Sequence, residues 1–126
     1  MRILLDTHVL LWWLAGSPSL PEAAGALIGD PENTVFVSAV SLWEIWLKVS
    51  LDKLRLPADF ESKLAAESFE SLPLTAAQTR QVALLPWLHR DPFDRMLVAQ
   101  AQTEKLTLLT ADDRVAAYGD FVRLAR

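Results

Sequence analysis

Blocks of hydrophobic and polar positions alternate along the chain and predict strands and helices in turn. Short apolar runs rich in β-branched or aromatic residues predict strands, and longer runs with helical spacing predict helices. The predicted strands span residues 3–5, 34–37, 69–72, 106–109 and 121–124. The predicted helices span residues 7–15, 21–28, 41–49, 59–67, 75–84, 91–105 and 111–117. Strands that alternate with helices indicate an α/β domain with a central, mainly parallel sheet.

The composition indicates one folded domain over residues 1–126. Of its 126 residues, 52% are hydrophobic and 22% are charged, which excludes a disordered chain. Five tryptophans are many for this length, so some of these rings are expected in the core or at a partner interface.

Charge and cysteine usage narrow the chemistry. The formal net charge of -4 argues against a non-specific nucleic-acid binder, but not against a nuclease whose clustered carboxylates hold cations. The absence of cysteine excludes disulfides, zinc–thiolate sites and cysteine nucleophiles. The chain opens without a signal-peptide pattern and holds no apolar run long enough for a bilayer, so a cytoplasmic protein without membrane association is expected.

Four acidic residues are predicted to lie at the same edge of the sheet. Asp6 ends the first strand, Glu44 lies near the start of the third helix, Asp94 opens the long helix, and Asp112 follows the fourth strand. Ligands of open parallel sheets bind beyond the carboxyl ends of the strands. We therefore expect these four side chains to converge at that edge.

Ordinary helix capping explains each acid taken alone. Asp6 can cap the helix that follows it, and Ser41 and Glu44 fit a capping box. Glu44 can also pair with Lys48, four residues further on. The start of the long helix and the segment around Asp112 fit caps as well.

Capping explains the set less well, because the neighbours of Glu44 and Asp6 are almost all apolar. A helix with such neighbours is expected to be mostly buried, and a buried carboxylate is costly unless it is paired or binds a cation. Oxygen ligands suit Mg²⁺ or Mn²⁺. Carboxylates with such ions favour hydrolysis of a phosphodiester by metal-activated water.

Four ordered segments resemble the PIN-domain ribonucleases and, within them, the VapC toxins of bacterial VapBC toxin–antitoxin modules. The segments are residues 4–14, 41–48, 89–101 and 108–112, and together they extend over almost the whole chain. The residues after the second segment also look familiar, although Asp52 stands where glycine is expected.

The resemblance implies a three-layer α/β/α fold and an Mg²⁺- or Mn²⁺-dependent endoribonuclease toxin. It also implies RNA as substrate, a homodimer, and a VapB-type antitoxin that wraps the toxin and blocks its active site. The implied catalytic and metal-binding residues are Asp6, Glu44, Asp94 and Asp112. Asp91 is a further candidate beside Asp94, and Asp113 can share or replace the role of Asp112. Thr7 and Thr110 are either orienting hydroxyls or ordinary caps.

Other side chains are open to two interpretations. Arg90, Lys48 and Lys53 are candidates for RNA phosphates but also fit solvated surface cations, whereas Arg95 is favoured as a phosphate contact. His8 and His89 are more readily explained as ordinary histidines than as general bases.

Two further questions remain open. Trp12, Trp13, Trp43 and Trp46 belong either to the core or to a groove for an antitoxin helix. The principal competing function is a degenerate PIN fold that binds proteins without catalysis. Haloacid-dehalogenase-type phosphatases are disfavoured because they require a second acid where His8 stands.

Overall fold

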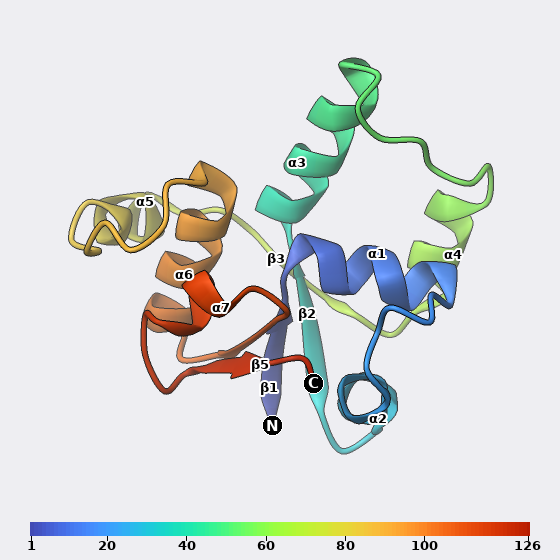
Figure 1. Ribbon diagram of the computed structural model, residues 1–126, viewed down its shortest axis with the longest axis horizontal. Coiled ribbons are helices and arrows are strands. Elements are labelled where there is room, and N and C mark those ends of the chain that lie inside the picture. The colour runs from blue at the N-terminus through green and yellow to red at the C-terminus, as the bar shows by residue number, and fades with distance from the viewer.

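The computed structural model describes all 126 residues and contains the predicted strands and helices (Figure 1). The strands are β1 (Arg2–Leu5), β2 (Thr34–Ser38), β3 (Glu70–Leu72), β4 (Thr107–Thr110) and β5 (Val122–Leu124). The helices are α1 (Thr7–Ala15), α2 (Glu22–Gly29), α3 (Ala39–Ser50), α4 (Phe60–Ala66), α5 (Ala76–Val82), α6 (Pro92–Glu104) and α7 (Asp113–Ala116). No helix has the length and apolar character needed to span a bilayer.

The five strands form one sheet in the order β3-β2-β1-β4-β5, and every neighbouring pair is parallel. The last residue of β1, Leu5, lies opposite Leu109 of β4, and the last residue of β2, Ser38, lies opposite Leu72 of β3. All the strands therefore reach one edge with their carboxyl ends, where α1, α3 and α7 begin.

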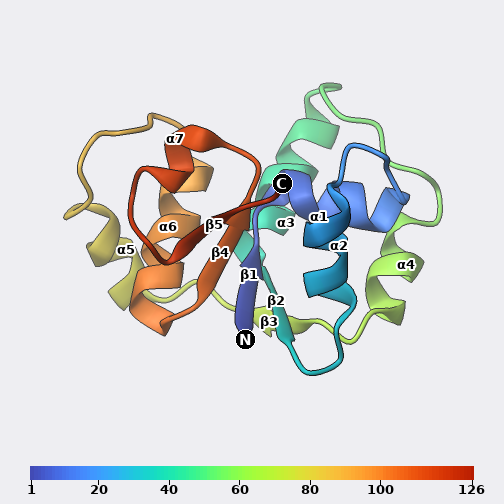
Figure 2. The ribbon, with the colours of Figure 1, turned by 60° about the horizontal axis from the view of Figure 1, so that its bottom comes forward.

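The sheet is buried on both faces, as the continuous apolar strands require. Successive residues of β1 point to opposite sides: Ile3 and Leu5 pack with α1 and α2, whereas Leu4 packs with α6. Figure 2 shows α1, α2 and α4 on one side of the sheet and α5, α6 and α7 on the other. This arrangement confirms the predicted three-layer α/β/α architecture.

The start of α3 differs from the prediction. The helix begins directly after β2, and Ser38 is its N-cap, with its hydroxyl accepting from the backbone N–H of Val40. Ser38 and Ser41 are both suitable caps by residue type, and only the length of β2 decides between them. The predicted capping box of Ser41 and Glu44 is therefore wrong.

The expectation that α3 is mostly buried is also wrong. Val40, Ser41, Glu44 and Ile45 form its buried side, whereas Trp43 is 59% exposed and Trp46 43% exposed. Figure 1 shows α3 and the segment that leads to α4 projecting beyond the sheet. The surplus of apolar residues on this helix therefore faces outward.

Asp52 shows why glycine is expected at its position. Its φ of 56° lies in the left-handed region, just after α3 ends. Glycine enters this region without steric cost, whereas aspartate tolerates it through its short polar side chain. Aspartate therefore adopts, in the turn after α3, the backbone conformation for which glycine is expected.

Candidate metal-binding site

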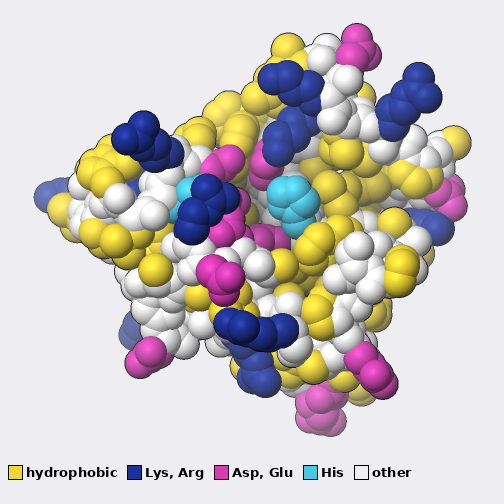
Figure 3. All heavy atoms as spheres, viewed as in Figure 1, with side chains coloured by type: hydrophobic (Ala, Val, Ile, Leu, Met, Phe, Trp, Pro, Cys, Tyr) yellow, Lys and Arg dark blue, Asp and Glu magenta, His cyan; other side chains and the backbone are white.

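The four predicted acidic residues converge at the carboxyl edge of the sheet. Asp6 follows β1, Glu44 lies in α3, Asp94 lies in the first turn of α6, and Asp112 precedes α7. The charge of Glu44 acts on Asp6, and the charge of Asp6 acts on Asp94. In Figure 3, acidic side chains gather at the centre of this face, with histidine beside them and lysine and arginine around them.

Asp6 is both a helix cap and a buried site carboxylate. Its Oδ1 accepts from the backbone N–H of Val9 at 2.9 Å, which confirms the capping interpretation, and its Oδ2 accepts from the hydroxyl of Thr110. The residue is 5% exposed. Burial raises the pKa of Asp6, although both hydrogen bonds favour the ionised form. Helix capping therefore does not offset the free-energy cost of burying the charge of Asp6.

Glu44 carries the clearest sign of a missing partner. It is the sixth residue of α3 and is 3% exposed. Its Oε2 accepts from Nζ of Lys48 at 2.6 Å, which confirms the predicted pair and raises the pKa of Lys48. Its Oε1 is buried without any hydrogen-bond partner. Leaving a buried polar atom unsatisfied costs about 1–3 kcal/mol, and more for a charged group, so this oxygen is a candidate ligand atom.

Asp94 is positioned by the start of α6. Asp91 is the N-cap and accepts from the backbone N–H of Asp94 at 2.9 Å. Burial, followed by the nearby charge of Asp91, raises the pKa of Asp94 to about 6. Asp91 thus shapes the site as a cap and a neighbouring charge.

Asp112 lies in the site but is already paired. Its two carboxylate oxygens accept from the guanidinium of Arg114 at 3.2 and 3.1 Å. Partial burial acts to raise the pKa of Asp112, but the hydrogen bonds from Arg114 outweigh it and leave this pKa below its usual value. Asp113 has a side-chain exposure of 85% and pairs with Arg126, and it lies at the rim of the hollow that Asp6 and Asp112 line.

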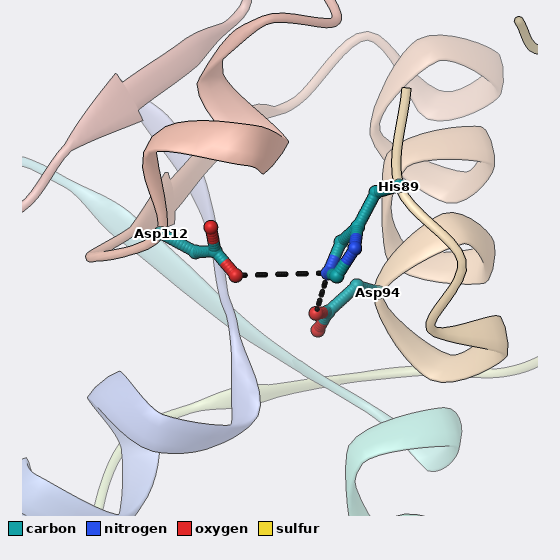
Figure 4. A group of neighbouring side chains, drawn as sticks. All are labelled: His89, Asp94 and Asp112. Atoms are coloured by element: carbon teal, nitrogen blue, oxygen red, sulfur yellow. Dashed lines mark hydrogen bonds and ion pairs between the residues drawn. The ribbon is translucent and has the colours of Figure 1, made fainter. Parts of the chain in front are cut away.

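His89 lies between two of the acids, a position that sequence reasoning did not give it (Figure 4). Its Nε2 is 2.8 Å from Oδ2 of Asp94 and 3.6 Å from Oδ2 of Asp112. Its Nδ1 accepts from the backbone N–H of Arg90 at 3.1 Å, so the proton of the neutral ring belongs on Nε2. The signal in the sequence was only that His89 precedes the Asp91–Asp94 motif.

The two threonines next to the acids have different roles. Thr110 donates to Asp6 and also accepts from the backbone N–H of Asp112 at 3.1 Å, so it links two predicted site residues. Thr7 hydrogen-bonds to Ser41 at 3.1 Å instead of to a carboxylate. Thr110 therefore fits the orienting role, and Thr7 joins α1 to α3.

Arg95 does not face the surface, and its predicted role as a phosphate contact is wrong. It is 4% exposed, and its guanidinium donates to the carbonyl oxygens of Pro86 and Val82 at 2.9 and 3.2 Å. It also lies 3.8 Å from the ring centre of Trp87. These contacts place the side chain of Arg95 beneath the loop before α6, and its position in the sequence did not reveal them.

The remaining candidate cations and His8 are either exposed or already paired. Arg90 and Lys53 are exposed, as the surface-cation interpretation expects, and Lys48 is committed to Glu44. His8 is exposed, lies 6.2 Å from Trp12 between ring centres, and lines one hollow together with Asp6 and Asp112. No side chain other than a carboxylate offers a free, buried ligand atom.

The donor set fits a hard divalent cation. Oε1 of Glu44 is a buried oxygen without a hydrogen-bond partner, and Asp6 and Asp94 bring carboxylates whose raised pKa values record the cost of their burial. His89, Asp94 and Asp112 also approach within 4.8 Å. The proton on Nε2 makes His89 a hydrogen-bond donor to Asp94, so the atoms of this cluster that are free to meet a cation are carboxylate oxygens.

The chain belongs to the PIN-domain family. The family model for the PIN domain matches residues 3–120, which takes in all the site residues described above. The parallel sheet and the acidic residues at its carboxyl edge are therefore those of a PIN domain.

The chain is similar to a ribonuclease in sequence and to two solved structures in fold. The chain is 29% identical over 119 residues to Ribonuclease VapC22 of Mycobacterium tuberculosis, covering 92% of this chain and 91% of the relative. Its fold is similar to VapBC2 from Rickettsia felis bound to a promoter DNA fragment, with a TM-score of 0.73, 19% identity, and coverage of 98% of this chain and 97% of that chain. It is also similar to FitAcB from Neisseria gonorrhoeae, with a TM-score of 0.67, 23% identity, and coverage of 98% and 96%.

Replacing Asp94 tests the cost of the buried charge in metal-free protein. The pKa of Asp94, about 6, lies above its unfolded value of about 3.9. Between these two pKa values, Asp94 is still protonated in the folded protein but ionised in the unfolded chain. The contribution of Asp94 to the free energy of unfolding therefore declines as the pH rises through about 6. In EDTA at pH 7.5, Asp94→Asn should therefore be more stable than wild type by about 2 kcal/mol.

Urea unfolding from pH 4 to pH 8 measures this difference. The advantage of Asp94→Asn should shrink as the pH falls toward 4, and Mn²⁺ should stabilise wild type more than the variant. An advantage that is absent, or that does not change with pH, would contradict the assigned charge state.

Proposed function

We propose that this protein is a divalent-metal-dependent endoribonuclease and the toxin of a toxin–antitoxin module, working in the cytoplasm. The observation that carries the enzymatic part is the buried, unpartnered Oε1 of Glu44 beside Asp6 and Asp94. Membership of the PIN-domain family and the likeness to Ribonuclease VapC22 support RNA as the substrate.

Asp6, Glu44 and Asp94 would hold Mg²⁺ or Mn²⁺, and Asp112 would complete the pocket. When bound, the ion supplies charge neutralisation at the phosphodiester and activation of the attacking water. The chain's own contribution is preorganisation: Thr110 holds Asp6, and Lys48 holds one oxygen of Glu44. Asp112, whose oxygens are occupied by Arg114, acts at the margin of the site.

Exposed cations next to the acids would receive the RNA backbone. Arg114 has a side-chain exposure of 68%, and it lines the same hollow as Asp6 and Asp112. Arg90 lies across from it, around a second hollow that Arg114 also lines. A few local cations suffice here, because the negative total charge disfavours extended backbone binding.

A groove between α1, α3 and α4 would bind the antitoxin. We call it the α1–α4 groove; its apolar lining is Leu11, Trp12, Leu14, Ile45, Leu54, Leu56, Pro57 and Phe60. Its lining also includes four basic residues, Lys48, Lys53, Arg55 and Lys63. An amphipathic segment with acidic flanks fits this combination. The groove shares His8 and Trp12 with the acidic hollow, so an occupant would also reach the catalytic edge.

The degenerate, protein-binding alternative requires the acidic cluster to be a remnant. A remnant would be expected to lose the costly members first, since nothing offsets buried charge without a cation. Asp6 and Glu44 are nevertheless both retained at 5% and 3% exposure. We therefore favour catalysis over a binding module.

A series of carboxamide variants tests the proposed site. Wild type with Mn²⁺ should cleave a fluorogenic RNA, and EDTA should abolish the cleavage. Asp6→Asn and Asp94→Asn should each lower the rate by more than about 100-fold, because each removes a ligand of the ion that stabilises the transition state. Asp112→Asn should cost less, since Arg114 already holds that carboxylate.

Asp120→Asn is the matched control, because this exposed aspartate lines neither of the two hollows next to the acids. It should retain wild-type activity. Cleavage that survives in both Asp6→Asn and Asp94→Asn would place the active site elsewhere, and wild type that neither cleaves RNA nor binds Mn²⁺ would leave the protein-binding alternative.

A second apolar surface would form the homodimer. This Trp43–Trp87 face is lined by Val40, Trp43, Leu74, Val82, Ala83, Trp87, Pro92, Phe93 and Met96. Trp43 and Trp87 are 59% and 77% exposed, and Arg90 is the one exposed charged residue in the lining. A two-fold interface brings equal charges together, so an almost uncharged face suits a second copy of the chain better than the basic α1–α4 groove does.

Trp43→Glu should convert the dimer to a monomer, because it places two carboxylates in the apolar interface. Trp46→Glu is the matched control: it lies on the same helix with 43% exposure but outside the Trp43–Trp87 face. Sedimentation equilibrium measures both. A monomeric wild type, or a Trp43→Glu protein that remains dimeric, would exclude this interface.

A further inference from the structure

We infer that His89, clamped by Tyr118 and Arg95, is a positioning residue that fixes the carboxylate of Asp94 for cation binding. The inference rests on the proposed function and adds to it a histidine that is not itself a ligand. The buried ring of His89 lies directly against Asp94 (Figure 4). Capping of α6, which Asp91 provides, does not require this contact.

Both ring nitrogens of His89 are engaged, and this fixes the ring's orientation. Nδ1 accepts from the backbone N–H of Arg90 at 3.1 Å, and Nε2 donates to Oδ2 of Asp94 at 2.8 Å. A donor to an ionised carboxylate makes a charge-assisted hydrogen bond, which is stronger than a neutral one. The bond occupies one oxygen of Asp94 and leaves the other for a cation.

The backbone of His89 is held by Tyr118, a residue that follows α7. Its N–H donates to the hydroxyl of Tyr118 at 3.2 Å, and the same hydroxyl accepts from Nη1 of Arg95 at 2.9 Å. Tyr118 follows α7, whereas Arg95 is in α6. One hydroxyl therefore joins the loop that carries His89 to two separate elements.

Arg95 holds the rest of that loop. The segment between α5 and α6 contains no helix or strand, yet the carbonyl oxygen of Pro86 within it accepts from the buried guanidinium. The carbonyl oxygen of Val82, the last residue of α5, accepts from the same guanidinium. Trp87 packs its ring on the same guanidinium at 3.8 Å. Arg95 has no carboxylate partner among its bonds, so its charge is used to order this loop.

These contacts form a continuous chain from the buried arginine to the site acid. Arg95 orders the loop, Tyr118 holds the backbone of His89, and the ring of His89 orients Asp94. Groups that orient a metal ligand through its outer hydrogen bond change metal affinity by roughly 10–100-fold. Removing the Nε2 donor should therefore weaken cation binding more than it weakens the fold.

The matched variants are His89→Gln and His89→Leu, which have similar size but differ in whether they can donate. Mn²⁺ affinity is measured by calorimetry without RNA, and thermal unfolding is measured in EDTA. His89→Leu should bind Mn²⁺ about 10-fold more weakly than wild type, and His89→Gln should stay within about 3-fold. The two variants should melt at similar temperatures, which separates positioning from a general loss of stability.

Two results would overturn the inference while the proposed function stands. One is wild-type Mn²⁺ affinity in His89→Leu; the other is an equal loss in His89→Gln and His89→Leu. Wild type that binds no Mn²⁺ and cleaves no RNA would instead overturn the proposed function, and this inference with it.

Tyr118→Phe supplies an independent test of the clamp. It removes the hydroxyl that accepts from Arg95 and from the backbone of His89, and should weaken Mn²⁺ binding in the wild-type background. In the His89→Leu background the same change should have little further effect on Mn²⁺ binding, because Tyr118 acts through His89. Equal losses in both backgrounds would exclude that route.

Discussion

The crowding of carboxylates at one buried edge of a parallel sheet is the constraint on which the rest of this molecule depends. Asp6 and Glu44 are 5% and 3% exposed, and burial raises the pKa of Asp94 to about 6. Such a cluster persists only where neighbouring groups and a cation offset its cost. Thr110, Lys48 and His89 each engage one oxygen of an acid, and Oε1 of Glu44 remains for the cation.

The features that the sequence predicted well are local ones. Asp6 directly follows an apolar run that predicts a strand, so its position at the end of that strand could be predicted from its neighbours in the sequence. The strand–helix alternation likewise led to the parallel sheet. The start of α3 was missed because Ser38 and Ser41 are equivalent by residue type, and the strand that precedes them decides between them. The exposure of Trp43 and Trp46 was missed because an apolar composition does not distinguish a core from a partner surface.

Arg95 and His89 show what depends on tertiary contacts. Both flank the acidic motif, where a cation or a base is a natural expectation, yet one is buried beneath a loop and the other is turned toward Asp94. Their common partner, Tyr118, lies 29 residues beyond His89. Spacing within the motif carries no information about such a contact. The two residues join the acidic site to the loop between α5 and α6, so one network of contacts supports both the fold and the proposed metal binding.

The most direct test of this account is the position of the ion. Crystals grown with Mn²⁺ would give an anomalous difference peak, and we expect it between Asp6, Glu44 and Asp94, about 2.0–2.4 Å from one oxygen of each. The ligand from Glu44 should be Oε1, the oxygen without a hydrogen-bond partner. A peak bound by Nε2 of His89 with Asp112, and distant from Glu44, would contradict the assignment of the cation to the buried carboxylates.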